Sequence, residues 1–353
     1  MIKKPVFAIG IMSGTSLDGI DLVYVEFDNN NFQNFSILHS ETVSYNKEWK
    51  FTLQEAIHFS SDKLLELDLN YGDLLGATVN KFVANYKIAK IDFIASHGHT
   101  VLHEPKKGRT LQVGNGQVIA NKTNQKVVCD FRTQDVQLGG QGAPLVPIGD
   151  ELLFADYDYC LNLGGFSNIS YHTNGKRIAY DICAVNIVLN KYAKELGFDF
   201  DDGGQIAASG SILTSVSKEL KALSYYQKEA PKSLGLEWVQ EHVFPKLVAS
   251  DANPTDILRT FTDHIAWAIA NELPKEATVL VTGGGAFNTF LIAEIKRYKK
   301  VNLILPEVTL INFKEALIFA FLGLLRVDNQ VNCLKSVTGA RKNHSSGEIF
   351  YPN

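Results

Sequence analysis

The 353-residue sequence lacks several features that define whole classes of protein. Its four cysteines are far apart and form no CxxC pair, which excludes a disulfide framework and fits a reducing cytoplasm. Its 34 Lys and Arg against 38 Asp and Glu give a net charge of −4 without long basic blocks, so we expect no nucleic-acid or anionic-membrane surface. No uninterrupted apolar run approaches the roughly 18 residues that a membrane span needs. We therefore expect a cytoplasmic protein whose partner is a small molecule.

The composition that is present indicates an ordinary globular protein. Hydrophobic residues make up 45% of the chain and charged residues 20%, which supplies a large core and excludes disordered, coiled-coil and collagen-like chains. The length suggests roughly two domains. Apolar residues 6–12 follow Lys3 and Lys4 but lead to no clear cleavage site, so we expect no secretory signal peptide.

Apolar runs and turn residues predict two halves that open in the same way. Residues 6–11 and 20–27 have the composition of two strands joined by a turn rich in Gly, Ser and Asp. The same arrangement of strand, glycine turn and further strands recurs over residues 159–181. Periodicity and the helix start at Asn253-Pro254 predict the remaining elements: a strand at 35–43, a helix around 75–86, a strand at 91–95, a helix from 254, a strand at 277–282, a helix at 287–297, a strand at 301–305 and a helix at 313–325.

These elements predict an α/β fold of two related domains. We expect the first domain to cover residues 1–150 and the second residues 151–353, facing each other across residues 139–147. A cleft between two such domains is the natural place for a ligand.

The turn between the first two strands is the first candidate binding element. Its glycines, hydroxyls and exposed amides can surround anionic oxygens, although the P-loop pattern and its lysine are absent. A phosphate would then be held by amides, hydroxyls and a metal ion bridged by Asp18 or Asp21. The alternative is a tight hairpin in which Gly and Asp serve the geometry alone.

A run of three glycines, Gly283, Gly284 and Gly285, lies between a predicted strand and a predicted helix. Without side chains, the backbone lets a ligand approach closely, and the helix start adds positive potential. A nucleotide is plausible here, and a simple strand-to-helix turn is an equal alternative. Two glycine elements, one in each half, favour a bound nucleotide.

Asp181 ends the third strand of the second half, where a carboxylate can face a cleft. It could act as a general base that takes a proton from water or a hydroxyl. A helix N-cap is an equal alternative, because residues 186–196 are predicted to be helical.

A cluster of histidines, His97, His99 and His103, follows the strand at 91–95. A zinc site is conceivable, but no carboxylate or cysteine stands at an evident ligand spacing, so polar contacts to a substrate are favoured. Arg132 could hold a carboxylate with two hydrogen bonds, or pair with Asp130 or Asp135 in a structural network. Glu315 is interpreted by position as a first-turn acid of an apolar helix.

Taken together, these segments resemble the anhydro-N-acetylmuramic acid kinases, bacterial enzymes of the sugar kinase, heat-shock-70 and actin superfamily. The resemblance runs nearly from end to end, and its matching segments are residues 10–21, 96–100, 110–114, 130–132, 139–147, 162–170, 231–235, 282–288, 314–320 and 336–340. It implies two ribonuclease H-like lobes around a central cleft, which is the actin-like ATPase fold.

The resemblance also implies a reaction. ATP and water would convert 1,6-anhydro-N-acetylmuramate to N-acetylmuramate 6-phosphate in cell-wall recycling, with Asp181 activating the water and Mg²⁺ bridging the phosphates. A homodimer is a further possibility. The implied site residues are Gly14, Thr15, Ser16, Leu17, Asp18, Gly19, Ile20, Asp21, Gly283, Gly284, Gly285 and Asn288 for ATP, Asp18 and Asp21 for the metal, and His97, Thr100, Arg132 and Glu315 for the sugar.

One segment departs from the family pattern. The family usually has Asp-Thr-Gly-Pro-Gly-Asn where this chain has residues 181–186 as Asp-Ile-Cys-Ala-Val-Asn. Two glycines and a hydroxyl are lost, so a backbone that approached a ligand through glycine must now carry side chains. The alternatives are therefore a kinase for a different amino sugar and a nucleotide-binding sensor with impaired catalysis.

Overall fold

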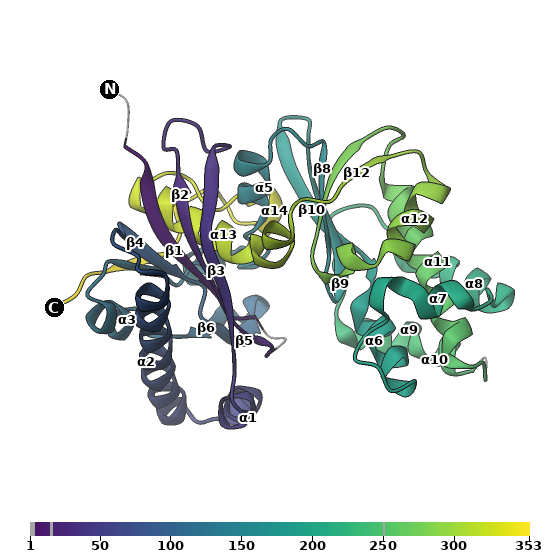
Figure 1. The fold of residues 1–353 in the computed structure, drawn as a ribbon, viewed down its shortest axis with the longest axis horizontal. Coiled ribbons are helices and arrows are strands. Elements are labelled where there is room, and N and C mark those ends of the chain that lie inside the picture. Colours follow the sequence, from purple (N-terminus) through teal and green to yellow (C-terminus); the bar gives the residue numbers. More distant parts are fainter. Residues whose placement is uncertain (1–3, 15–16, 250) are drawn as a thin grey trace. The chain divides into compact units, whose positions relative to one another are not determined.

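The computed structural model describes residues 4–14, 17–249 and 251–353. The chain divides into two compact units, which we call unit 1 (Met1–Ala155 with Phe313–Asn353) and unit 2 (Asp156–Asn312). Each unit contains a mixed β-sheet with helices packed against it (Figure 1). The predicted α/β class is therefore confirmed.

The main sheet of unit 1 has the strand order β13-β7-β4-β1-β2-β3. The first three strands of the chain form an antiparallel meander, and β4 and β7 continue the sheet in parallel with β1. A separate two-stranded ribbon pairs β5 with β6. The strands are β1 (Val6–Met12), β2 (Gly19–Phe27), β3 (Phe35–Ser44), β4 (Phe93–Ser96), β5 (His99–Glu104), β6 (Arg109–Val113), β7 (Val127–Cys129) and β13 (Glu348–Phe350).

Both faces of strand β1 are covered by protein. Ile9 and Ile11 are fully buried in a core with residues of the long helix α2. Gly10 lies against the helix α13, and a Cβ at this position would overlap the carbonyl oxygen of Ala316. The helices of unit 1 are α1 (Lys47–Glu55), α2 (Ser61–Tyr86), α3 (Gly116–Thr123), α4 (Thr133–Gln137), α5 (Pro147–Leu153), α13 (Val308–Val327, which begins in unit 2) and α14 (Lys335–Thr338).

The last 41 residues complete unit 1, although the sequence placed them in the second domain. Strand β13 pairs with β7, and the amide of Gln141 donates to the carbonyl of Thr338 at 2.8 Å. The predicted boundary at 150/151 therefore needs correction to 155/156, with a return to unit 1 at residue 313. Residues 139–147, predicted to separate the domains, lie inside unit 1 because the C-terminal segment binds them.

The sheet of unit 2 repeats this strand order. It reads β10-β9-β8-β11-β12, with β8, β9 and β10 antiparallel and with β11 and β12 parallel to β8. Strands β3-β2-β1-β4-β7 of unit 1 follow the same order and directions, so the predicted repetition of the opening pattern is confirmed. The strands are β8 (Tyr159–Leu163), β9 (Phe166–Thr173), β10 (Lys176–Ala184), β11 (Thr278–Thr282) and β12 (Asn302–Ile304).

Helix α11 is the central helix of unit 2 and buries most of its side chains. It begins as the sequence predicts: the side chain of Asn253 accepts from the amide of Asp256, and Pro254 occupies the first turn. Its buried side chains belong to the hydrophobic core of unit 2, together with side chains of the sheet and of neighbouring helices. The helices of unit 2 are α6 (Asn186–Glu195), α7 (Gln205–Ser209), α8 (Thr214–Lys221), α9 (Leu236–His242), α10 (Phe244–Val248), α11 (Pro254–Glu272) and α12 (Thr289–Tyr298).

Helix α13 is long and apolar enough to meet the criteria for a membrane span, which corrects the expectation that no segment approaches this length. However, 72% of its most apolar window is buried inside the protein. Gly323 of this helix packs so closely on Phe93 and Ala95 that a side chain would not fit. Its apolar character is therefore explained by packing on the sheet of unit 1.

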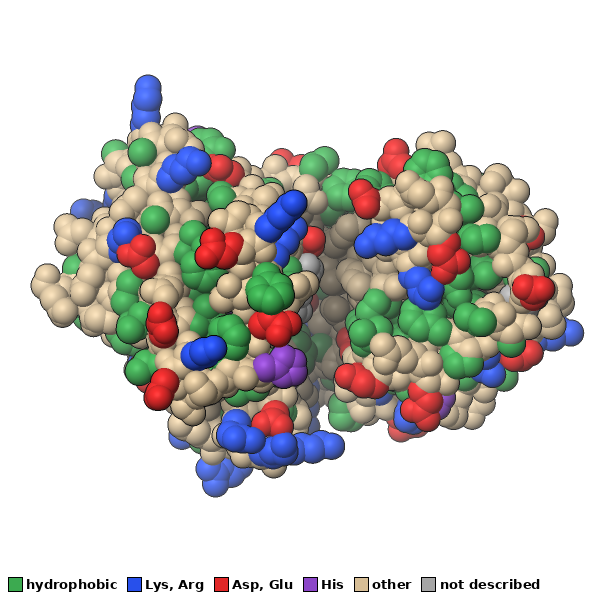
Figure 2. Space-filling view, turned by 90° about the horizontal axis from the view of Figure 1, so that it is seen from below, with side chains coloured by type: hydrophobic (Ala, Val, Ile, Leu, Met, Phe, Trp, Pro, Cys, Tyr) green, Lys and Arg blue, Asp and Glu red, His purple; other side chains and the backbone are tan. Residues whose placement is uncertain are grey.

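The surface carries charges of both signs. On the face drawn in Figure 2, basic and acidic side chains are interspersed with apolar and uncharged ones on each unit. This distribution agrees with the near-neutral composition.

Candidate active site

The first glycine turn connects β1 to β2. Gly19 starts β2 beside β3, where a Cβ would lie 2.6 Å from the carbonyl oxygen of Val43. Leu17 has a φ of +60°, and its amide is 3.5 Å from the carbonyl oxygen of Gly14. The predicted ligand residues Thr15 and Ser16 lie outside the described residues.

Ile20 is a different case, because its side chain is 1% exposed and belongs to the core of unit 1. Only its backbone could therefore contact a ligand. The two carboxylates of the turn are better placed: Asp18 is exposed, and Asp21 accepts a hydrogen bond of 2.6 Å from Thr42 Oγ1. Burial and the negative charge of Asp18 raise the pKa of Asp21, while the Thr42 bond lowers it.

His97 and Arg132 form the central polar contact of unit 1. The Nδ1 atom of His97 lies 2.8 Å from the carbonyl oxygen of Gly98, and Arg132 donates to Nε2 from Nε and Nη2 at 3.0 and 2.8 Å. Burial and the neighbouring guanidinium lower the pKa of His97 well below its ordinary value. His97 is therefore neutral, with its proton on Nδ1.

Arg132 itself is held by its surroundings. Its Nη1 donates to the carbonyl oxygen of Gly142 at 2.6 Å. Burial lowers its pKa to about 10, while the negative charges of Glu315 and Asp135 act in the opposite direction. The guanidinium still carries its charge at neutral pH.

Glu315 faces this group from helix α13. The helix begins at Val308, so the interpretation of Glu315 as a first-turn acid is wrong. The side chain of Glu315 is partly exposed, but the protein atoms around its carboxyl group raise the pKa of that group. The positive charge of Arg132 lowers this pKa, and the negative charge of Asp21 raises it. Arg132, Glu315 and Asp21 thus form one electrostatically coupled group.

Among the residues that the structure describes, the histidines near the β5–β6 ribbon are not grouped with other possible metal ligands. Both nitrogens of His97 are occupied, and His103 is exposed with Nδ1 3.2 Å from Thr110 Oγ1. His99 is buried, which lowers its pKa. The hydroxyl of Thr100 accepts from Gln112 Nε2 at 3.4 Å.

Next to His97 is a cavity of about 180 Å³ in unit 1. It is lined by polar groups that include Asp68, Gln112 and Asp130. Of these residues, the sequence singled out only Asp130, as a possible partner of Arg132. Asp68 was missed because it lies within α2, far along the chain from the motifs. In the folded chain its Oδ1 accepts a hydrogen bond of 2.8 Å from the amide of Gly114.

In unit 2, Asp181 stands at an irregularity of strand β10, where the pairing with β9 shifts between Asp181 and Cys183. Its Oδ2 atom accepts from the amide of Leu234 at 2.9 Å, and its backbone carbonyl accepts from Tyr225 at 2.6 Å. Burial raises the pKa of Asp181, and the Leu234 amide lowers it. Helix α6 has no side-chain cap and begins after Val185, so the N-cap alternative for Asp181 is wrong.

The segment that supports Asp181 is anchored by a second group of residues. The carbonyl of Lys232 accepts from the amide of Asp181 at 3.2 Å. Its Nζ atom pairs with Glu272 at 2.8 Å, and Tyr180 donates to the same carboxylate at 2.8 Å. Sequence reasoning included residues 231–235 in the resemblance but gave them no role. No local pattern links them to Asp181, because the contact spans more than 50 residues.

The residues that depart from the family pattern pack into the core of unit 2. Ile182, Cys183, Ala184 and Val185 are each at most 1% exposed. The Cys183 amide donates to Ser167 Oγ at 3.2 Å, and the Val185 amide donates to the carbonyl of Gly165 at 2.8 Å. The substituted side chains therefore point into the core, and the backbone amides are used within the unit.

The triple glycine follows β11 and leads into the short helix η5 (Gly284–Phe287). Gly283 has a φ of +81°, and a Cβ there would lie 2.7 Å from Asn162 Oδ1. Asn288 caps α12 by accepting from the amide of Leu291 at 2.9 Å.

This glycine loop borders a cavity of about 290 Å³ inside unit 2. Gly284, Gly285 and Asn288 line it together with the aromatic rings of Phe200 and Phe287. The sequence missed Phe200, because it precedes η3 (Asp202–Gly204) and has no helical or strand periodicity around it. Its exposed ring, 59% accessible, is the feature that could have indicated a ligand surface.

The sequence profile of the family described as "Anhydro-N-acetylmuramic acid kinase" matches residues 6–352. The chain belongs to this family. The anhydro-N-acetylmuramic acid kinase of Shewanella sediminis (strain HAW-EB3) is 34% identical over 370 residues, covering 98% of each chain. That of Clostridioides difficile (strain 630) is 33% identical over 381 residues, covering 97% of this chain and 98% of its own.

Membership of the anhydro-N-acetylmuramic acid kinase family confirms the resemblance drawn from the motifs. It also confirms the predicted class of enzyme, a kinase of cell-wall recycling that uses ATP.

Proposed function

We propose that this chain converts 1,6-anhydro-N-acetylmuramate, water and ATP to N-acetylmuramate 6-phosphate and ADP. Water attacks the anomeric carbon and gives a proton to the Asp181 carboxylate, while the bond from that carbon to O6 breaks. O6 then attacks the γ-phosphorus, and the bond from phosphorus to the ADP oxygen breaks. The proton taken by Asp181 finally leaves to solvent.

The arrangement around Asp181 is the observation that carries this proposal. Its Oδ2 accepts one amide hydrogen bond from Leu234, which orients the carboxyl group. Partial burial raises its pKa and makes it a stronger base than an exposed carboxylate. Asp181 does not cap helix α6, which leaves its second carboxylate oxygen for the proposed role.

Arg132 is the proposed partner of the sugar's lactyl carboxylate. The guanidinium is charged at neutral pH, and His97 fixes its orientation through two hydrogen bonds. A fixed guanidinium suits a planar carboxylate. Glu315, coupled to Arg132 by charge, would accept hydrogen bonds from sugar hydroxyls, and Thr100 would add a further polar contact.

ATP is proposed to use glycine elements of both units. The cavity beside Gly284 and Gly285 has two aromatic rings at its border, which suits the adenosine end. Gly283, Gly285 and Asn288 would shape this loop through their close contacts. The turn from Gly14 to Asp21 would hold the phosphates.

A magnesium ion fits the donor chemistry of the same turn. Asp18 and Asp21 supply hard carboxylate oxygens. Burial first, and the charge of Asp18 to a lesser extent, raise the pKa of Asp21, and a bound cation would relieve the repulsion between the two carboxylates. When bound, the ion would neutralise charge on the phosphates during transfer.

The predicted arrangement of two ribonuclease H-like lobes around a cleft is part of this proposal. Asp181 and Arg132 belong to different units and would have to act on one sugar molecule. A cytoplasmic location and a homodimer remain predictions, and light scattering on the purified chain would measure the oligomeric state.

A coupled assay for ADP tests the proposal. The purified chain should release ADP with 1,6-anhydro-N-acetylmuramate, and mass spectrometry should find phosphate on O6. Release of ADP only with reducing amino sugars would instead support a kinase for a different sugar. Nucleotide binding without sugar-dependent release would support a sensor.

A further inference from the structure

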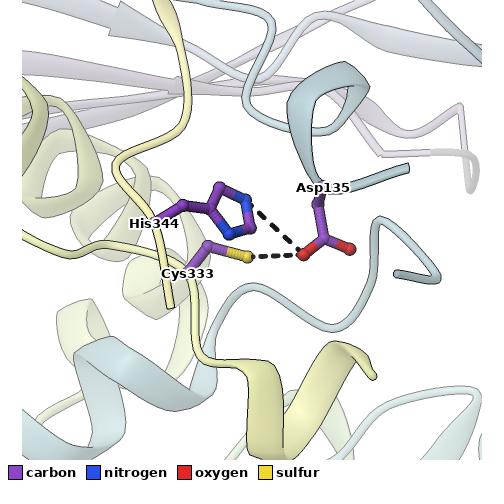
Figure 3. A group of neighbouring side chains, drawn as sticks. All are labelled: Asp135, Cys333 and His344. Carbon is purple, nitrogen blue, oxygen red and sulfur yellow. Dashed lines mark hydrogen bonds and ion pairs between the residues drawn. The ribbon is translucent and has the colours of Figure 1, made fainter. Parts of the chain in front are cut away.

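Three potential metal ligands meet in unit 1, and none of them has been assigned to catalysis or substrate binding. Asp135 lies on helix α4, and Cys333 and His344 lie on the C-terminal segment (Figure 3). Cys333 and His344 are joined by two backbone hydrogen bonds of 3.1 and 3.2 Å, which hold their side chains next to each other. The three residues are 0%, 1% and 5% exposed.

The ligand atoms have the spacing of a tetrahedral site. Cys333 Sγ lies 3.1 Å and His344 Nε2 lies 3.5 Å from Asp135 Oδ1, and all three atoms are within 4.8 Å of one another. In a tetrahedral zinc site, ordinary metal–ligand bond lengths place sulfur and oxygen about 3.6 Å apart and nitrogen and oxygen about 3.4 Å apart. A single ion could therefore contact all three atoms with only small movements.

His344 provides the second indication of a ligand. Its Nδ1 lies 3.1 Å from the carbonyl oxygen of Lys342, an arrangement in which Nδ1 carries the proton and Nε2 the lone pair. Its Nε2 is buried, faces Asp135, and has no hydrogen-bond partner among the residues that the structure describes. A lone pair facing a carboxylate calls for a cation between them, and a backbone carbonyl on the other nitrogen is the usual partner of a metal-bound histidine.

We propose that Asp135, Cys333 and His344 bind one divalent transition-metal ion, with zinc as the expected occupant. The thiol, imidazole and carboxylate are the ligand types that zinc prefers. On binding, the metal–sulfur bond replaces the S–H bond of Cys333, and the proton goes to solvent. The thiolate and carboxylate then balance the two charges of the ion, so the buried site is neutral.

The proposed ion would act on the structure around the sugar site. Asp135 Oδ2 accepts from the Gly142 amide at 2.7 Å, and the Gly142 carbonyl accepts from Arg132. Asp135 Oδ1 also accepts from Thr338 at 2.7 Å. The ion would therefore fasten the C-terminal segment to α4 and to the loop that supports Arg132.

Metal content of the full chain tests this inference independently of kinase activity. The chain is purified from zinc-supplemented cells, and zinc per chain is measured by mass spectrometry for wild type, Cys333→Ser, His344→Gln and the control Cys160→Ser, which alters a buried cysteine outside the cluster. We expect about one zinc in wild type and control, and less than about a tenth of that in the two cluster variants. Zinc should also raise the Tm of chelator-treated wild type.

Cobalt substitution guards against variants that fail to fold. Wild type loaded with Co²⁺ should show a thiolate-to-cobalt charge-transfer band, and Cys160→Ser should keep it. The proposal would be overturned if wild type contains no zinc, shows no charge-transfer band with Co²⁺, and has a Tm that zinc does not change. The three residues would then form a metal-free hydrogen-bonded cluster. Equal zinc in wild type and folded Cys333→Ser would also overturn it.

Discussion

Units 1 and 2 share one strand order but hold their candidate catalytic groups in different ways. In unit 1 a second side chain orients the candidate group: Arg132 donates two hydrogen bonds to His97, besides one to the Gly142 carbonyl, and its charge is coupled to that of Glu315. In unit 2, backbone holds the site: the Leu234 amide orients Asp181, and glycines border the cavity. Two sheets with the same strand order can therefore carry different sites. The segments that follow their strands decide whether the site is an oriented charged side chain or a surface of backbone atoms.

Units 1 and 2 should respond differently to substitutions in their candidate sites. In unit 1 a change of charge should act on substrate affinity, because the fixed guanidinium is the proposed binding group. In unit 2 a change at Asp181 should act on the chemical step, and a change at a glycine should act on the fit of the nucleotide.

The largest effect is expected in unit 2. Asp181→Asn removes the proposed base, so kcat should fall by about 10²- to 10⁴-fold. Nucleotide affinity, measured by calorimetry, should stay within about twofold. Asp251→Asn is the matched control, because Asp251 is exposed on the same unit and its positive φ suits Asn. A loss of less than about tenfold in kcat for Asp181→Asn would remove Asp181 from the role of base.

The second effect belongs to unit 1. Arg132→Ala should raise the KM for the sugar by roughly 10- to 100-fold, the range expected for lost hydrogen bonds to a charged group. The KM for ATP should change far less. Arg341→Ala, an exposed arginine of the same unit, should leave both constants unchanged. Equal increases in the two KM values would show that Arg132 has no particular role toward the sugar.

The third effect tests the backbone surface of unit 2. Gly283→Ala introduces a Cβ 2.7 Å from Asn162 Oδ1 at a φ of +81°. This strain should lower stability by about 1–3 kcal/mol in denaturant unfolding and raise the KM for ATP. Gly165→Ala is the control, because a Cβ there meets nothing within 4 Å. Similar losses in both variants would contradict a specific close approach at Gly283.

The smallest effect is a pH-dependent change of stability. The folded state raises the pKa of Asp181, so ionisation of this group destabilises the fold as pH rises through that raised pKa. Asp181→Asn should therefore have a higher Tm than wild type at pH 7, and the difference should shrink toward the ordinary pKa of an aspartate. Wild-type kcat/KM should fall on acidification as the base becomes protonated. A lower Tm for the variant at pH 7 would refute the destabilising role of the carboxylate.

The elements that the sequence predicted are those in which apolar runs and glycine turns act locally, and the short helices and strands between residues 99 and 153 and between 205 and 248 were not predicted. The strands around Val6 and Tyr159 and the cap at Asn253 were each predicted within a few residues. The return of the C-terminal segment to unit 1 could not be predicted, because it depends on the pairing of β13 with β7 across more than 200 residues.

The candidate site divides along the same line. Asp181, Arg132 and the glycine loop were identified from motifs, which are contiguous in the sequence. Phe200 was missed, and Leu234 lay in a matching segment without an assigned role, because the contacts of both residues form only in the folded chain. Likewise, Asp135, Cys333 and His344 have no recognisable ligand spacing, and only the fold brings them together.

The destination of the water oxygen tests the central claim most directly. The wild-type chain reacts briefly with ATP and 1,6-anhydro-N-acetylmuramate in ¹⁸O-water, with preformed product in the same water as an exchange control. The proposed mechanism predicts sugar-dependent ADP and one ¹⁸O at the anomeric position of the phosphosugar beyond the exchange control, with none in phosphate. Label in free phosphate, or ADP formed without the anhydro sugar, would contradict it.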